Sequence, residues 1–121
     1  MKFYKCDVCG KIHLEVTKGS PKTICCGKEM IELSPKDHDG ALEKHLPVVE
    51  FTNDEIIVSV GEVMHPMTEE HYIDFVYVEL VNGGIYLKVK DIPVVRAKCS
   101  AEDVVAVYEY CNLHGLWVTR L

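Results

Sequence analysis

Hydrophobic and polar side chains alternate along much of the second half of the chain. Apolar side chains occupy every second position of residues 85–90 and 95–99, and most positions between them are charged. A repeat of two residues is that of a β-strand with one buried face. Residues 55–60 are rich in β-branched side chains, and residues 72–81 are largely apolar on both faces, as expected inside a sandwich. Residues 103–110 give one more strand.

Turn residues separate these strands. The sequence Asn82-Gly83-Gly84 predicts a hairpin turn, because asparagine and glycine tolerate positive φ. We find no helical periodicity over ten or more residues, and expect at most a turn at residues 67–70. Several short strands joined by turns predict an all-β fold, in the form of an immunoglobulin-like antiparallel β-sandwich.

The polar segment 33–40 contains proline and glycine and is typical of a linker. We therefore predict a small module at residues 1–36 and the β-sandwich at residues 37–121. A piece of about 35 residues is too short to be stable through apolar burial alone. Metal ligation would supply the missing stability, so we expect a metal-stabilised module.

Composition narrows the class of protein. The chain has 121 residues, of which 48% are hydrophobic, and a formal net charge of −6. An acidic chain without a basic run argues against nucleic acid or an anionic membrane surface as a partner. The first residues lack a long apolar stretch, so we expect no signal peptide, no membrane span and a cytoplasmic protein.

Six cysteines are present in this expected reducing environment. Thiols there are more often metal ligands or catalytic groups than disulfides, although three disulfides remain the alternative for a secreted chain. Cys99 alternates with Val95 and Ala97, so we expect it to pack in the core.

Four of the cysteines are grouped near the start of the chain. Cys6 and Cys9 form a two-residue-spaced knuckle, in which Gly10 relieves the tight turn. Cys25 and Cys26 follow as adjacent thiols, which cannot chelate as a relaxed knuckle does, so we expect a distorted tetrahedron. Four thiolates suit zinc or a single iron, and the spacing does not decide between them.

A second set of donors is spread over the rest of the chain. It consists of His45, His65, His71, Cys111 and His114. Taken singly, each histidine is more often a solvated side chain than a ligand. Together, four imidazoles and one thiolate suit iron, copper or zinc, and exceed the four ligands of a structural zinc site. This excess predicts a metal that takes part in chemistry.

The motifs resemble a known family. Residues 43–45 (EKH), 61–73 (GEVMHPMTEEHYI) and 110–117 (YCNLHGLW) resemble the superoxide reductases, also called neelaredoxins. The N-terminal cysteines resemble the desulforedoxin module. Both in one chain resemble the desulfoferrodoxins, which are two-iron superoxide reductases.

The resemblance implies a role for each matching residue. His45, His65, His71 and His114 would be equatorial nitrogen ligands of one iron, and Cys111 its axial thiolate. Lys44 would lie beside the open face, and Glu43 would be the carboxylate that occupies the sixth position in the ferric state. Cys6, Cys9, Cys25 and Cys26 would hold the second iron.

The resemblance also implies an activity and partners. The substrate would be superoxide, reduced to hydrogen peroxide, and the electron donor a small protein such as rubredoxin. Family analogy further favours a homodimer. Two alternatives remain at this stage: a non-catalytic iron electron carrier, and a zinc-stabilised binding module.

Overall fold

The computed structural model describes residues 1–38, 45–61 and 64–121. The chain divides into two compact units, Met1–Ser34 and Pro35–Leu121. Within the described residues, no helix has the length and apolarity needed to cross a membrane.

The first unit is a small antiparallel sheet with a short hairpin. Its sheet has the order β2-β1-β5, and the hairpin pairs β3 with β4. The strands are β1 (Lys2–Lys5), β2 (Ile12–Glu15), β3 (Ile24–Cys25), β4 (Lys28–Glu29) and β5 (Ile31–Leu33). Among the residues of this unit, Phe3, Cys6 and Met30 are buried. One of these three is a predicted metal ligand, so little of the unit is held by apolar packing.

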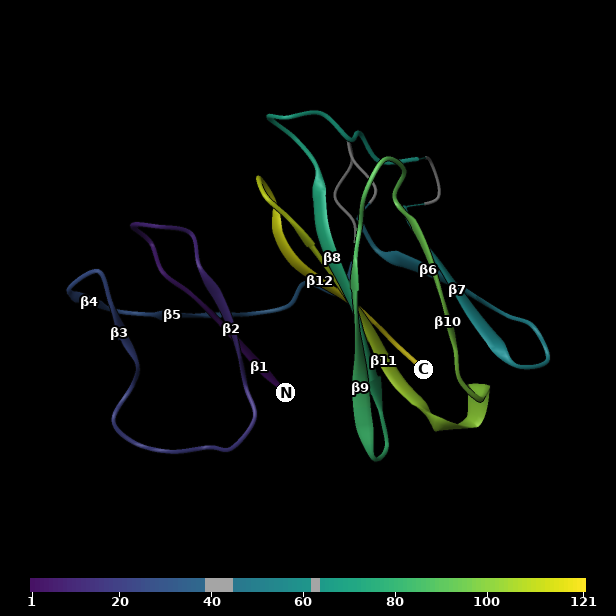
Figure 1. Ribbon diagram of the computed structural model, residues 1–121, viewed down its shortest axis with the longest axis horizontal. Coiled ribbons are helices and arrows are strands. Elements are labelled where there is room, and N and C mark those ends of the chain that lie inside the picture. The colour runs from purple at the N-terminus through teal and green to yellow at the C-terminus, as the bar shows by residue number, and fades with distance from the viewer. Residues whose placement is uncertain (39–44, 62–63) are drawn as a thin grey trace. The chain divides into compact units, whose positions relative to one another are not determined.

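The second unit consists of two antiparallel sheets, drawn in teal, green and yellow in Figure 1. In the described residues, one sheet has the order β10-β7-β6 and the other β12-β11-β8-β9. The strands are β6 (Pro47–Phe51), β7 (Glu55–Val60), β8 (Ile73–Leu80), β9 (Gly83–Lys88), β10 (Val94–Lys98), β11 (Val104–Cys111) and β12 (Gly115–Arg120). The predicted all-β antiparallel class is confirmed.

The core of the second unit lies between the two sheets. Inward positions of β7 alternate with half-buried ones, and Ile56 and Val58 have no exposed surface. They pack in one cluster with Val78 of β8 and Val107 of β11. Each such side chain contributes about 1.5–3 kcal/mol when fully buried. Cys99 packs against the same cluster, as predicted.

The predicted hairpin turn is displaced by one residue. Leu80 pairs with Gly83, so the turn consists of Val81 and Asn82, and the two glycines begin β9. The prediction was wrong because it assigned the glycines to the turn. A Cβ at Gly84 would instead overlap the hydroxyl of Tyr77, so a glycine there makes room for that ring.

Candidate metal centres

The five donors of the second unit all lie at strand ends. His45 precedes β6 by two residues, His65 follows β7, and His71 precedes β8 by two residues. Cys111 is the last residue of β11, and His114 directly precedes β12. The pairs β6 with β7, β8 with β11, and β11 with β12 are antiparallel neighbours. Antiparallel pairing brings the end of one strand to the start of the next, so the donors gather at one end of the sandwich.

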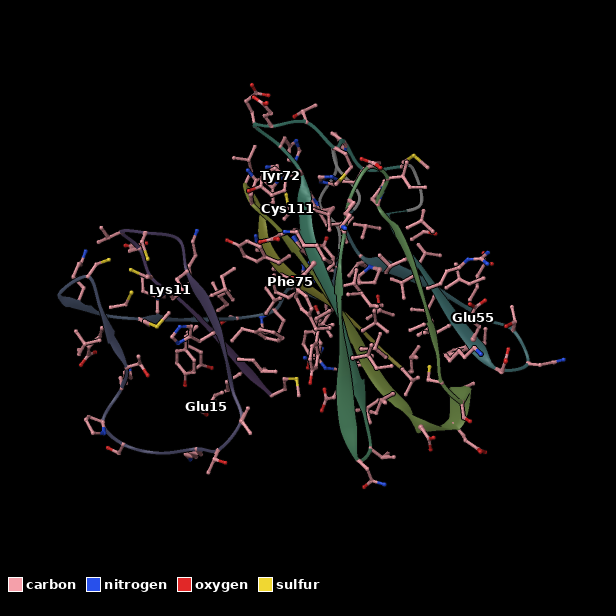
Figure 2. The ribbon with its side chains drawn as sticks, in the orientation of Figure 1. Lys11, Glu15, Glu55, Tyr72, Phe75 and Cys111 are labelled. Atoms are coloured by element: carbon pink, nitrogen blue, oxygen red, sulfur yellow. The ribbon has the colours of Figure 1, made fainter. Side chains whose placement is uncertain are left out.

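Two local features shape this end of the sheet. Tyr110 pairs with Phe75 but Cys111 pairs with Ile73, so β8 has one extra residue beside the site. Bulges of this kind re-aim side chains and are frequent next to active sites. Cys111 also pairs with Gly115, whose φ of +86° closes the turn that carries His114. Figure 2 shows Cys111 and Tyr72 together where β11 ends and β8 begins.

The four imidazoles form a four-sided ring. Successive ring centroids are 4.8 Å apart from His45 to His65, 4.5 Å from His65 to His71, 5.0 Å from His71 to His114 and 4.8 Å from His114 to His45. The diagonal from His45 to His71 is longer, at 6.4 Å. The rings therefore surround a common centre, with His65 and His114 at the other pair of opposite corners.

The sulfur of Cys111 contacts two opposite corners of this ring. It is 3.7 Å from Nε2 of His65 and 3.8 Å from Nδ1 of His114. The sulfur is therefore nearly equidistant from these two nitrogens. Cys111 has no exposed surface, so its thiol is shielded from solvent oxidants.

The donor atoms fit a metal ion. The ligand atoms of His45, His71, Cys111 and His114 lie within 4.8 Å of one another, and Nδ1 of His114 is 3.2 Å from Nε2 of His45. Nitrogen and sulfur donors about 2.1 and 2.3 Å from one ion, at right angles to each other, are about 3.0–3.1 Å apart. The nitrogen pair matches this spacing, and the sulfur stands slightly further out.

Hydrogen bonding fixes which ring nitrogen faces the centre. Nδ1 of His65 donates to the carbonyl oxygen of Pro66 at 2.8 Å, because that oxygen only accepts. The lone pair of His65 is then on Nε2, the atom that faces the sulfur. His114 presents Nδ1 instead. Since it lies three residues from Cys111, its nearer ring nitrogen reaches the centre from a short turn.

Asn112 and Thr68 hold the loop that carries His71. The side-chain oxygen of Asn112 accepts the N–H of Tyr72 at 2.8 Å, and its amide nitrogen donates to the carbonyl of Glu70 at 2.9 Å. The hydroxyl of Thr68 accepts the N–H of His71 at 3.0 Å. Sequence reasoning missed both residues. Asn112 had a signal, its position between two predicted ligands, but Thr68 had none.

An aromatic ring supports His45 from the side. Trp117 is 6% exposed and stacks on His45, with centroids 4.6 Å apart and an interplanar angle of 11°. His45 and His65 are themselves 2% and 4% exposed. Cys111, His45 and His65 are therefore shielded from water, whereas His71 and His114 are half-buried.

The four N-terminal cysteines also gather around one point. Their sulfurs lie within 4.8 Å of one another, and the sulfur of Cys25 is 3.7 Å from that of Cys9 and 4.0 Å from that of Cys26. Tetrahedral thiolates about 2.3 Å from an ion are about 3.8 Å apart, so the site fits a metal. The adjacent pair requires a φ of +52° at Cys26, and Gly10 has the positive φ expected of the knuckle.

The thiols of this cluster differ in acidity. The backbone N–H groups of Cys9 and Val8 lower the pKa of Cys6 to about 6. Hydrogen bonding to the thiolates of Cys6 and Cys9 raises the pKa of Cys25 to about 12. Four sulfurs this close cannot all lose their protons without a cation between them, so metal binding must release protons.

The predicted residues Glu43 and Lys44 lie outside the described residues. His13 and His38, the two histidines outside the predicted set, are exposed. The structure thus brings together the five donors of one predicted set and the four of the other.

Comparisons with known proteins agree with these two groups. Residues 1–33 match the family model described as the desulfoferrodoxin N-terminal domain, and residues 37–120 match the model described as desulfoferrodoxin. A desulfoferrodoxin of Syntrophotalea carbinolica is 42% identical over 120 residues, which cover 97% of this chain and 94% of that protein. A desulfoferrodoxin of Nitratidesulfovibrio vulgaris is also 42% identical, with 96% and 93% covered.

A solved structure shares the fold. The superoxide reductase from Treponema pallidum has a TM-score of 0.84 and 31% identity, covering 98% of this chain and 97% of its own. The family models together span nearly the whole sequence, and each coincides with one of the two donor clusters. The chain therefore belongs to the desulfoferrodoxin family.

Proposed function

We propose that this protein is a superoxide reductase that converts superoxide to hydrogen peroxide at the centre formed by His45, His65, His71, His114 and Cys111. The observation that carries the proposal is the convergence of a ring of imidazoles and a buried cysteine sulfur at one end of the sandwich. Membership of the desulfoferrodoxin family and the likeness to a superoxide reductase structure support it.

The reaction consumes one electron and two protons for each superoxide and gives one hydrogen peroxide. Ferrous iron, when bound, supplies the electron. The four histidines and Cys111 would hold the iron, and these five protein donors would leave room for a small ligand. The thiolate of Cys111 would raise the electron density at the iron, as a thiolate ligand does in haem enzymes. The imidazoles would bind through their unprotonated ring nitrogens.

Burial of the donors matters for the reaction. Because Cys111 has no exposed surface, its sulfur keeps its electron density instead of sharing it with water. The stacked ring of Trp117 excludes water from one side of His45. Electrostatic effects at the centre are therefore stronger than they would be at an exposed site.

Lys44 and Glu43 complete the proposed site. The chain carries a net charge of −6, which opposes the approach of an anionic substrate. Lys44 directly precedes His45 in the sequence, and the family resemblance gives its positive charge the role of attracting superoxide locally and of ordering the water that delivers protons. By the family resemblance, Glu43 would be the carboxylate that binds the iron in its oxidised state.

The chain holds two iron centres. The second is the cluster of Cys6, Cys9, Cys25 and Cys26, whose spacing supports four-thiolate ligation. We assign it to a desulforedoxin-like module at residues 1–36, and the catalytic centre to a neelaredoxin-like domain at 37–121; the compact units and the family matches have closely similar limits. We further propose a cytoplasmic homodimer that receives electrons from a rubredoxin-like protein.

The test is the reaction of the reduced, iron-loaded protein with superoxide. We expect a fast second-order reaction that yields hydrogen peroxide, and catalytic turnover when reductant is supplied. Cys111→Ser should lose the visible thiolate-to-iron band of the oxidised protein and most of the turnover, whereas the control Cys99→Ser should keep both. A parent protein that only changes redox state, without consuming superoxide catalytically, would show the proposal to be wrong.

Lys44 is tested separately through salt dependence. Lys44→Ala should slow the reaction at low ionic strength and flatten its dependence on salt, because the attraction is screened as salt rises. Lys98→Ala removes the same charge from β10 and should leave the rate unchanged. Equal rates for Lys44→Ala and the parent at low salt would remove Lys44 from the proposal.

A further inference from the structure

Lys36 contacts His114 and Trp117 at the proposed catalytic centre, although it belongs to none of the family motifs. It directly follows Pro35, the first residue of the second unit. Its backbone N–H donates to the carbonyl of Leu116 at 3.0 Å, and its own carbonyl accepts the N–H of Val118 at 2.8 Å. This parallel bridge with Trp117 fixes Lys36 against the start of β12.

The side chain of Lys36 makes two contacts beside the centre. Its ammonium group donates to the backbone carbonyl of His114 at 2.8 Å. The same nitrogen lies 4.9 Å from the centroid of the Trp117 ring, within cation–π range. Trp117 in turn stacks on His45. One positive charge therefore touches the backbone of one ligand and the ring that supports another.

No carboxylate of the described residues forms an ion pair with this charge. The neighbouring Asp37 pairs with Arg120 at 3.5 Å and with His38 at 3.1 Å. Among the ion pairs formed by the described residues, none includes Lys36. Acidic side chains outnumber basic ones in the chain, so this cation stands out in a negative background.

We propose that Lys36 is a positioning residue that holds the His114 turn and raises the reduction potential of the catalytic iron; this rests on the iron centre of the proposed function. Oxidation increases the positive charge of the centre by one. A fixed cation nearby disfavours that increase and so stabilises the reduced state. The bond to the His114 carbonyl also keeps the short turn in the geometry that presents Nδ1.

The primary measurement is the midpoint potential of the catalytic iron in an optical redox titration. The variants are Lys36→Met, which removes the charge at similar length, Lys36→Arg, which keeps it, and Lys98→Met as a matched control. Lys98 is exposed, and its partner in the β10–β7 ladder is Glu55. Glu55 is at the end of β7 opposite to Val60, and the metal centre is at the Val60 end. We expect Lys36→Met to lower the potential.

The expected change is modest because Lys36 is exposed and screened. It corresponds to about three- to tenfold in the equilibrium between reduced and oxidised iron. A tenfold change is about 59 mV for one electron. Lys36→Arg should restore the parent potential, and Lys98→Met should not shift it. Should Lys36→Met fail to fold, Lys36→Gln provides the same loss of charge.

A second readout does not depend on iron. Trp117 is the only tryptophan in the chain, so the fluorescence of the zinc-loaded protein under tryptophan-selective excitation reports on the surroundings of Trp117. Lys36→Met should shift the emission maximum, and Lys98→Met should leave it unchanged.

The proposal is overturned if Lys36→Met and Lys98→Met both have the parent's reduction potential. A lower thermal stability of Lys36→Met would not rescue it, because loss of a purely structural lysine would lower stability without changing the potential. A parent protein that fails to consume superoxide would end the proposed function, while the potential shift would still decide the role of Lys36.

Discussion

Loss of the metal from the four-cysteine cluster should unfold the first unit and leave the second unit folded. The change that tests this is the double substitution Cys9→Ser/Cys26→Ser. Both side chains are exposed, so serine leaves no buried cavity behind. The remaining thiols, Cys6 and Cys25, are too few to close a tetrahedral site.

The magnitude follows from how little apolar surface the first unit buries. Phe3 and Met30 are 3% exposed each, and full burial of such side chains contributes about 1.5–3 kcal/mol per residue. Ordering the backbone costs about 1–2 kcal/mol for each residue. Two apolar side chains therefore offset the ordering of only a few residues. Structural zinc ligation contributes about 10–16 kcal/mol in peptides of this kind, so the metal decides the balance.

The assay is an amide NMR spectrum of the zinc-loaded protein, in which zinc serves as a diamagnetic substitute for iron. In the double variant, signals of β1, β2 and β5 should collapse to random-coil positions, while those of β6 to β12 stay dispersed. Cys99→Ser is the control and should retain both sets. Dispersed signals from β1 and β2 in a double variant shown by elemental analysis to lack the second metal would refute the reasoning.

Three further predictions concern the second unit. Burial raises the pKa of Tyr108 from 10.0 to about 12. The contribution of this group to stability, about 1–3 kcal/mol, is therefore complete below pH 10 and is lost as pH rises through 12. Urea unfolding should show this loss in the parent protein, and the Tyr108→Phe variant should not show it. Asn112→Ala breaks two hydrogen bonds to the loop before β8 and should lower the free energy of unfolding by about 1–3 kcal/mol and weaken metal binding, measured by competition with a chelator; unchanged affinity would contradict the clamp. Val107→Ala should destabilise by about 1–3 kcal/mol in chemical denaturation, and Val105→Ala, which is 38% exposed on the same strand, by much less.

The strands with a clear period were predictable from the sequence. Residues 55–60 form β7 with the predicted limits, and 72–81 contains β8. No strand was predicted at β6 or β12. Neither PVVEF nor GLWVTR alternates apolar and polar positions, so pairing with β7 and β11, rather than an internal pattern, determines these strands.

The identity of the donors was predictable, whereas their arrangement was not. Residue types and spacing suggested which side chains bind metal. The ring of imidazoles depends instead on register, because one extra residue in β8 opposite Cys111 changes which side chains face each other. The supports of the ring are also hidden in the sequence. Asparagine, threonine and lysine are common in loops, and only their partners reveal that Asn112, Thr68 and Lys36 hold the centre.

The two donor clusters differ most in exposure, and this difference matches two kinds of electron transfer. Cys111 and His45 are buried and His71 and His114 are half-buried, so much of the catalytic centre is shielded from contact with a larger protein. Cys9 and Cys26 are exposed, so a protein donor can come into contact with the sulfurs of the other centre. A small radical must bind the metal to react, while two proteins need only bring their metals close. Burial of one cluster and exposure of the other therefore suit a diatomic substrate at the first and a macromolecular electron donor at the second.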